Sequence, residues 1–476
     1  MSRPLVPAGV RGTLPREGTS DDGPRSLFPA RYLSRGEAQA LARRALGFST
    51  AEQARVTMGS GVRGNTRFAV NQISTAGDNY NVSVTVLSTF GKRSASVTTN
   101  RLDDAGLREA VQNSERLARL APEDPEAVPE LEPQQYQEGR GWGESTAALD
   151  PAGRAAAVRE VTEAARAAGL SATGYLQADA GSFAVANNKG LFAYGRQTGS
   201  AMTTTVRTAD GSGSGWAGAA HHDVARLDAR ALGARAIEKA RRSLNPVAVE
   251  PGRYTVILEP TAVGNLVQLI AFALNARNAD EGRSFFTKPG GGNKLGLKVV
   301  DERVSLTSDP LDPEAYANTF TGEGLPFNRT TWIENGVVRN LAYDRYWAQK
   351  QGTTPSPFGG TLRMSGGSAS IDEMIASTSR GILVTRFWYI RPVDPRTILY
   401  TGLTRDGTFL IEKGKITRAV KNLRFNESPI FLLNNLEAMG QPVRVSASED
   451  GGPGLAVVVP PVKARDFTFT SLSDAV

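Results

Sequence analysis

The chain has 476 residues, a formal net charge of +7, 40% hydrophobic residues and no cysteine. This length suffices for two or three domains with sizeable cores, and the composition excludes wholesale disorder. Without cysteine, the chain can form no disulfide and use no thiolate. Its only two histidines, His221 and His222, severely limit zinc sites and serine–histidine triads.

Residues 1–30 are rich in proline, glycine and charge, and we expect them to form a flexible lead. They hold no continuous apolar core of the signal-peptide kind, and no stretch of the chain approaches the length of a membrane-spanning helix. A cytoplasmic location and no membrane partner are the resulting expectations. Because the excess of 55 basic over 48 acidic residues contains no long basic run, nucleic acid is not an expected partner either.

The first predicted domain, residues 31–245, mixes helices with strands. Ser34 and Glu37 form a capping-box pattern that predicts a helix start. Strand patterns follow at 66–74 and 80–100, the second around a Gly91-Lys92 turn. A second helix is predicted from its apolar face, which comprises Leu107, Ala110, Val111, Ser114, Leu117 and Ala118. Four prolines then end this helix and mark an acidic linker near 121–145.

The rest of this domain repeats the order of helix, strands and helix. Asp150 suits an N-cap, Pro151 the first helical position and Gly169 the residue after the C-cap. Two strands are predicted around a turn at 187–190. Residues 210–216, which are rich in glycine and serine, are expected to form a flexible loop, and residues 228–243 a helix.

The second predicted domain, residues 246–476, is dominated by strands. Residues 253–260 predict a strand, and an apolar helix follows from Ala262. Turns are predicted at 334–336 and 413–414. The remaining strand patterns lie at 294–306, 329–344, 382–390, 407–425 and 454–472. The fold class is therefore α+β, with a mixed helix and sheet region followed by a β-rich domain.

Five segments, in their order and spacing, resemble the TldD/PmbA family from about residue 34 to the end. They are residues 66–74, 102–125, 251–270, 281–286 and 407–428. The resemblance implies a two-part protein that associates in pairs. In this family the TldD-type chain binds zinc through an HExxxH motif and a cysteine, and cleaves unfolded or short peptides. The PmbA-type chain, also called TldE, lacks these ligands and completes the chamber. The family is also linked to peptide-antibiotic maturation and to a DNA gyrase inhibitor pathway.

At the family's zinc positions this chain departs from the motif. The resemblance places Gln268 at the first histidine, Leu269 at the glutamate and Ala273 at the second histidine. Residues 451–463 fall in the cysteine region without a cysteine. Leucine cannot take a proton from a zinc-bound water, and alanine cannot bind metal. We therefore expect no catalytic residue and no cofactor in this chain, with zinc on a partner subunit.

The second face of the same helix suggests a place where peptide could bind. This face is uncharged and half apolar, and a loop with an arginine and a serine follows it. The candidate chamber-lining residues are Asn265, Gln268, Phe272, Asn275, Arg283 and Ser284. The alternative is a helix buried on all sides, with its amides satisfied internally.

The glycines of residues 290–292 have two interpretations. A phosphate-binding loop would need a GK[ST] ending and a following helix, whereas Lys294 leads here into a strand-like pattern. A plain loop is therefore the favoured interpretation. A mobile edge that meets a peptide or partner is the other.

Two further groups of polar residues bear on metal and acid–base chemistry. His221 and His222 are adjacent, so their side chains should point apart, and a glycine-rich loop precedes them. We expect exposed polar residues there, with metal binding as the alternative. The acidic pairs Asp280–Glu281 and Asp301–Glu302 are interpreted as solvated or capping charges rather than paired catalytic carboxylates.

The segment 380–407 combines aromatic and basic residues. Strand alternation would send Trp388 to one face and Phe387 and Tyr389 to the other. Arg386, Arg391 and Arg396 lie nearby. Either this is a core strand with exposed or paired arginines, or it is a surface for a partner or peptide.

Three functional hypotheses follow. The first is a non-catalytic TldD/PmbA-type subunit that forms a heterodimer with a zinc-bearing paralogue and helps to process unfolded or short peptides. The second is a homodimeric peptide-binding or scaffold protein without peptidase activity. The third is a metallopeptidase with unconventional ligands from aspartate, glutamate or the histidine pair.

Overall fold

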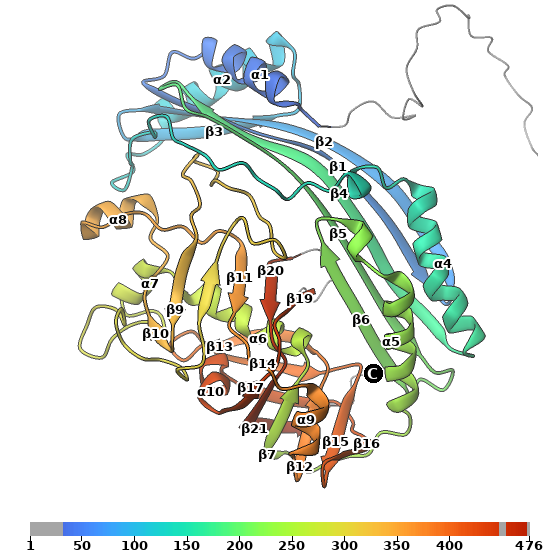
Figure 1. Ribbon diagram of the computed structural model, residues 1–476. Coiled ribbons are helices and arrows are strands. Elements are labelled where there is room, and N and C mark those ends of the chain that lie inside the picture. Colours follow the sequence, from blue (N-terminus) through green and yellow to red (C-terminus); the bar gives the residue numbers. More distant parts are fainter. Residues whose placement is uncertain (1–31, 447–453, 474–476) are drawn as a thin grey trace, which may run out of the picture.

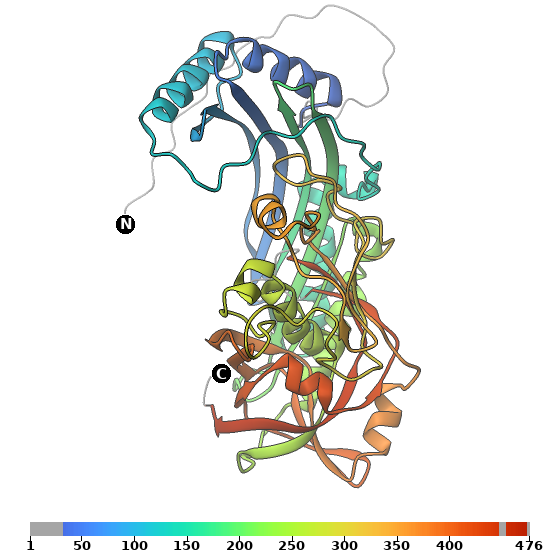
Figure 2. The ribbon, with the colours of Figure 1, turned by 90° about the vertical axis from the view of Figure 1, so that its left-hand side faces the viewer.

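The computed structural model describes residues 32–446 and 454–473 (Figure 1). The predicted lead of residues 1–30 lies outside these ranges. A long curved sheet makes up the first part of the molecule, and a strand-rich part lies against its concave side (Figure 1). In the view of Figure 2, the first two helices lie at one end of the molecule and the strand-rich part at the other. Within the described residues, no helix is long and apolar enough to cross a membrane.

The long sheet has six antiparallel strands in the order β3-β2-β1-β4-β5-β6. Its strands are β1 (Gln53–Ala69), β2 (Gln72–Phe90), β3 (Arg93–Thr99), β4 (Ser171–Asn187), β5 (Phe192–Arg207) and β6 (Ser214–His221). Buried and half-buried residues alternate along the first half of β1, as expected for a sheet with one face on a core. At roughly 3.4 Å per residue, its longest strands extend about 60 Å.

Helices cover the other side of this sheet. They are α1 (Arg35–Gly47), α2 (Asp104–Leu120), α3 (Glu144–Ala147), α4 (Pro151–Ala167) and α5 (Ala229–Arg242), with a 3-10 turn at Val224–Arg226. The predicted capping box of Ser34 and Glu37 is confirmed, and so is the Asp150 cap, which accepts a bond from the Gly153 amide. Gly169 follows the C-cap with φ +70.

Two apolar cores hold these helices to the sheet. One joins α1 and α2 to β1, β2 and β4 through residues such as Leu41, Val56 and Leu107. The other joins α4 and α5 to β4, β5 and β6 through residues such as Val161 and Leu176. Burial of an apolar face, rather than helical propensity, therefore keeps these helices in place.

Three predictions for this part were wrong in detail. The predicted strand 66–74 is a hairpin, because Val70 and Asn71 adopt φ of 50 and 60 and reverse the chain between β1 and β2. Leu117 is 40% exposed, while Glu115 is buried and accepts hydrogen bonds from Ser49 and Thr50. Residues 214–216 of the predicted loop belong to β6, where they pair with β5.

The second part contains two sheets. One has the strand order β10-β9-β8-β11-β20-β19, and the other the order β13-β14-β17-β21-β7-β12-β15-β16, with β18 added beside β21. Their strands are β7 (Gly252–Leu258), β8 (Leu306–Ser308), β9 (Thr330–Glu334), β10 (Val337–Val338), β11 (Thr361–Met364), β12 (Arg380–Val384), β13 (Phe387–Asp394), β14 (Leu399–Thr404), β15 (Thr408–Glu412), β16 (Lys415–Ala419), β17 (Leu423–Glu427), β18 (Leu436–Met439), β19 (Val443–Ser446), β20 (Ala456–Val459) and β21 (Val462–Leu472).

The helices of this part are α6 (Pro260–Ala273), α7 (Ala276–Asp280), α8 (Arg345–Gln351), α9 (Ile371–Ala376) and α10 (Pro429–Asn434). Helix α6 contacts strands of both sheets, and its apolar residues belong to the large core of this part. The predicted α+β class, with a mixed first region and a strand-rich second one, is confirmed.

Two predicted strands of this part differ in the structure. Most of residues 294–306 form turns and irregular backbone, and only Leu306 belongs to a strand. Gly296 has φ +78, and its amide donates a hydrogen bond to the Val338 carbonyl. The segment therefore runs beside β10 but forms no regular ladder with it. The predicted strand 382–390 breaks at residues 385 and 386, where the chain leaves β12 and enters β13.

The predicted acidic linker runs extended along the molecule. Residues 127–143 contain no helix or strand. Glu130 pairs with Arg55 of the long sheet at 2.8 Å, and Glu126 pairs with Arg277 of α7 at 2.7 Å. The linker therefore contacts both parts of the protein.

Candidate functional site

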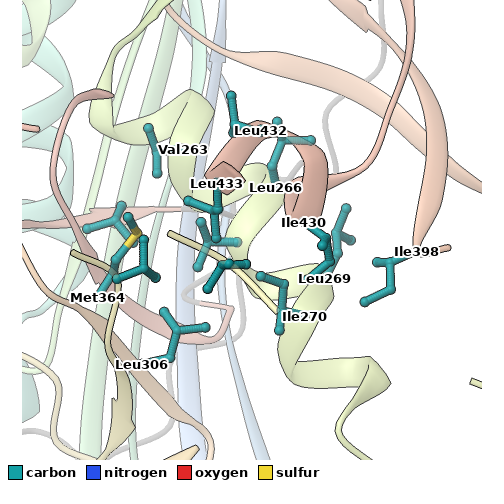
Figure 3. Packing of buried hydrophobic residues seen from close by; sticks show 14 of the residues in the cluster. Val263, Leu266, Leu269, Ile270, Leu306, Met364, Ile398, Ile430, Leu432 and Leu433 are labelled. Atoms are coloured by element: carbon teal, nitrogen blue, oxygen red, sulfur yellow. The ribbon is translucent and has the colours of Figure 1, made fainter. Parts of the chain in front are cut away.

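Helix α6 lies at the centre of the second part. Pro260 occupies its first turn, where the missing amide hydrogen costs nothing. Figure 3 shows Val263, Leu266, Leu269 and Ile270 of this helix among buried side chains, close to Ile430, Leu432 and Leu433 of α10. These apolar residues of α6 therefore serve packing.

The three positions that the resemblance places at the family's zinc motif do not fit a zinc ion. Leu269, at the base position, is 7% exposed and belongs to the apolar core. Gln268 is half-buried and offers only a neutral amide, and Ala273 offers no ligand atom. In the described ranges, no three His, Cys, Asp or Glu side chains form a group that could hold a metal.

The structure describes only part of the segment that the resemblance places at the family's cysteine. Residues 451–453 of the segment 451–463 lie outside the described ranges. The rest includes β20 and the start of β21, and residues 456–463 are all buried. Val457, Val459 and Val462 belong to the same core as α6.

In three of the six candidate lining residues, the polar side-chain atoms form hydrogen bonds with backbone groups. Asn265 is 3% exposed, and its Oδ1 accepts a hydrogen bond of 3.1 Å from the Phe387 amide. Asn275 caps α7 by accepting from the Asn278 amide at 2.9 Å. The buried Ser284 hydroxyl donates to the Ala273 carbonyl at 3.2 Å.

The other three candidates reach solvent. Phe272 is 63% exposed, Gln268 is half-buried and Arg283 is exposed beside Glu281. The structure thus divides the predicted lining set into three residues bonded to the backbone, of which Asn265 and Ser284 are buried, and an accessible remainder. The role of this remainder in binding peptide stays a prediction.

The glycine loop of residues 290–292 and the two acidic pairs show structural rather than catalytic contacts among the described residues. No helix follows Lys294, so the loop lacks the geometry of a phosphate-binding loop. Asp280 accepts hydrogen bonds of 2.7 Å from Asn293 and from the indole of Trp347. Asp301 pairs with Arg303, which holds the pKa of that carboxyl at about 2.

The histidine pair contradicts the expectation of exposed side chains that point apart. His221 is 8% exposed, and the two ring centroids are 4.2 Å apart. His221 Nδ1 accepts a bond of 3.0 Å from the Asp223 amide, while Tyr316 meets His222 edge-on. Burial lowers the pKa of His221 to about 4 and lowers that of His222 as well. The physical reason is tertiary, because β19 of the second part contacts β6.

The predicted alternation of the aromatic segment is also wrong. Phe387 is buried and packs 4.6 Å from Phe425. Tyr389, however, is 48% exposed with φ +56, because the ladder between β13 and β14 is irregular after Trp388. Trp388 and Tyr389 therefore lie beside each other, with ring centroids 5.5 Å apart.

A cavity that the sequence did not predict lies on the long sheet. Its volume is about 550 Å³, and β1, β2, β4 and β5 supply most of its lining, with Asn318 from the second part. We call it the sheet cavity. Gly61 and Gly181 allow β1 and β4 to approach there, since a Cβ on Gly61 would lie 2.8 Å from the Ala180 carbonyl. The lining is polar but largely uncharged, and includes Ser60, Asn81 and Gln197.

One charged pair is found at the sheet cavity. Arg63 Nε lies 2.6 Å from Asp179 Oδ1, and both residues belong to the lining. The glycines of the strands that form the cavity were the available signal in the sequence, because glycine in a strand often marks close backbone approach. A cavity between two parts of a chain is also a common place for ligands.

Comparison with protein families decides the affiliation. Residues 144–244 match the PmbA/TldA metallopeptidase central domain, and residues 251–471 match the C-terminal domain of the same group. The chain belongs to the TldD/PmbA family. Within this TldD/PmbA architecture, α6 lies in the matched C-terminal domain, whereas the lining of the sheet cavity draws on residues before 144 and on both matched domains.

Relatives within the TldD/PmbA family include proteins described as metalloproteases. One from Methanothermobacter thermautotrophicus is 27% identical over 252 residues, which cover 49% of this chain and 53% of the relative. A metalloprotease TldD homolog from Haemophilus influenzae is 25% identical over 216 residues, 42% of this chain and 43% of the relative. The chain thus spans about half the length of the curated relatives that it matches.

The TldD/PmbA fold extends over most of the chain. The crystal structure of TldE from Thermococcus kodakarensis superposes with a TM-score of 0.79 at 18% identity. The match covers 91% of this chain and 100% of that structure. At this identity the likeness establishes the shared fold.

Proposed function

We propose that this chain is a non-catalytic subunit of a TldD/PmbA-type metallopeptidase complex and pairs with a zinc-bearing paralogue. One observation carries the proposal: Leu269, which the resemblance places at the base position of the family's zinc helix, is packed into the large apolar core around α6. Gln268 and Ala273 at the ligand positions agree with it, as does the likeness of the fold to TldE. Zinc and its chemistry then belong to the partner subunit.

In this proposal the chain contributes a wall of the chamber that holds unfolded or short peptides. The sheet cavity supports this role, because its hydroxyl and amide groups can bond to the backbone of an extended peptide. Backbone contacts of this kind do not depend on the side chains of the peptide. The cytoplasmic location expected from the sequence remains a prediction.

The deciding experiment is co-expression of this chain with its TldD-type paralogue, followed by a peptide-cleavage assay and mass measurement. We expect a heterodimer that cleaves peptide, zinc in one subunit only, and little or no cleavage by this chain alone. A stable homodimer that ignores the paralogue would support the scaffold hypothesis instead. Stoichiometric zinc with cleavage by the lone chain would support unconventional ligands.

A matched pair of variants tests the chamber wall. Gln197→Ala removes a half-buried amide from the sheet cavity, whereas Gln112→Ala removes an exposed amide from the outer side of α2. We expect the first variant to raise the KM of the heterodimer for peptide several-fold and the second to leave it unchanged. Equal kinetics for both variants would remove the sheet cavity from the binding site.

A further inference from the structure

A second cavity, which we call the arginine cavity, lies where the long sheet meets the second part. Its volume is about 440 Å³. The sheet supplies a row of hydroxyl groups, including Thr203 and Thr205, together with Arg207 and Trp216. The rest of the lining comes from the segment between β12 and β13, from the start of β13 and from the turn after β14. None of these residues lines the sheet cavity.

The described lining of the arginine cavity carries an excess of positive charge. It contains three arginines, Arg207, Arg386 and Arg405, and one carboxylate, Asp406. Arg386 and Arg405 each approach Asp406 Oδ2 at 3.8 Å, which is an ion pair but too long for a hydrogen bond. The other oxygen of Asp406 accepts a bond of 2.6 Å from the Ser214 hydroxyl. One carboxylate is therefore shared between two guanidinium groups.

Arg207 adds a third cation for which the described residues supply no matching anion. It is half-buried at the end of β5, and it forms no ion pair with any residue that the structure describes. A half-buried cation in a cavity favours a negatively charged ligand, because part of its hydration is already lost. The shared Asp406 does not offset this charge.

Tryptophan rings fix the orientation of the other two arginines. The guanidinium carbon of Arg386 lies 4.6 Å from the ring centroid of Trp216, and that of Arg405 lies 4.1 Å from the ring centroid of Trp388. Stacking uses the flat face of a guanidinium and so restricts the directions in which its edge points. Arg386 is 7% exposed, so this charged group is built into the fold rather than held on the surface.

The backbone of the turn after β14 is held in an uncommon conformation. Asp406 has φ +54 and Gly407 φ +136. The Thr385 amide donates to the Gly407 carbonyl at 3.1 Å, and the Arg405 amide donates to the Arg386 carbonyl at 3.3 Å. These bonds join the two segments that carry Arg386 and Arg405, and so hold their backbones side by side.

We propose that the arginine cavity binds the oxyanion group, a carboxylate or a phosphate, of a compact polar molecule. Guanidinium edges match either group with paired hydrogen bonds. The volume lies within the range of small-molecule sites, and the hydroxyl row suits a polar rather than an apolar body. This site goes beyond the peptide chamber and does not depend on pairing with a zinc-bearing subunit.

Titration of the purified chain tests the proposal, with tryptophan fluorescence as the readout because Trp216 and Trp388 both line the cavity. The probes are inorganic phosphate, a short peptide with a free carboxyl terminus, and the same peptide with a terminal amide. We expect saturable binding of phosphate or the free-acid peptide, and at least tenfold weaker binding of the amide. Which of the two probes binds identifies the source of the oxyanion.

Two variants and one control make the test specific. Arg405→Gln and Arg207→Gln each remove a cavity charge, and we expect both to weaken binding at least tenfold. Arg418→Gln removes an exposed charge from β16 and should change affinity less than twofold. Circular dichroism melting verifies that each variant folds. If Arg405→Gln does not fold, Arg207→Gln alone tests the site. The absence of saturable binding, or equal weakening by the control, would overturn the site.

Discussion

The guanidinium of Arg277 in α7 forms a two-pronged ion pair with Glu126 of the linker. Nη1 lies 2.7 Å from Oε2, and Nη2 lies 2.7 Å from Oε1. The same side chain also meets Glu281, the C-cap residue of α7, at 3.0 Å. The contact links the proline-rich segment after α2 to the second part of the molecule.

We expect Arg277→Gln to loosen the linker. A glutamyl endopeptidase should then cut residues 123–138 several-fold faster, because cleavage requires local opening of the backbone. The control is Arg230→Gln, which breaks an exposed pair with Glu160 between α5 and α4. Unchanged cleavage of Arg277→Gln would show that this ion pair does not hold the linker.

Leu269 and Phe272 lie three residues apart on α6 in opposite environments, 7% and 63% exposed. Leu269→Ala should lower the free energy of unfolding by about 2–4 kcal/mol, because it removes buried methyl groups and leaves a cavity. Phe272→Ala should change stability by less than about 0.5 kcal/mol. Urea unfolding followed by circular dichroism measures both, and equal losses would contradict the burial of Leu269.

His221 should make stability depend on pH. Its pKa of about 4 lies below the ordinary 6.5, chiefly because of burial and next because of His222 and Arg444. The unfolded chain therefore binds a proton between these values that the folded chain does not, so stability falls as pH drops from about 6.5 towards 4. A shift of this size corresponds to about 3 kcal/mol.

His221→Asn isolates this contribution, since its side-chain oxygen can replace Nδ1 as acceptor for the Asp223 amide. Urea unfolding at pH 7.0 and 4.5 should show a larger loss for the natural chain than for the variant. The same pH dependence in both proteins would show that His221 titrates normally in the fold.

Gly64 of β1 and Gly77 of β2 are neighbours in the long sheet but tolerate side chains differently. A Cβ on Gly64 would overlap the guanidinium of Arg154, which is only 2% exposed and pairs with Asp78. Gly64→Ala should therefore lower stability by about 1–3 kcal/mol. Gly77→Ala meets open space and should be neutral or slightly stabilising. Thermal melting compares them, and equal melting temperatures would show that Arg154 moves aside without cost.

Local features were predictable because their physics is local. The capping box at Ser34, the Asp150 cap and the Gly91-Lys92 turn depend on side-chain and backbone preferences within a few residues. The assignment of Gln268, Leu269 and Ala273 to the family's zinc positions rests on the resemblance and stays a prediction. The sequence by itself thus determined the fold class and most helix starts.

Contacts between distant segments decided the rest. His221 is buried because β19 contacts β6, and Glu115 replaces Leu117 on the buried side because Ser49 and Thr50 bond to it. The predicted strand at 294–306 lacks a partner ladder, which no local pattern reveals. Both cavities combine residues from the long sheet with residues from the second part of the chain. Only packing between the two parts could place Arg207 and Arg405 in one cavity, because more than a hundred and ninety residues separate them and no sequence period connects them.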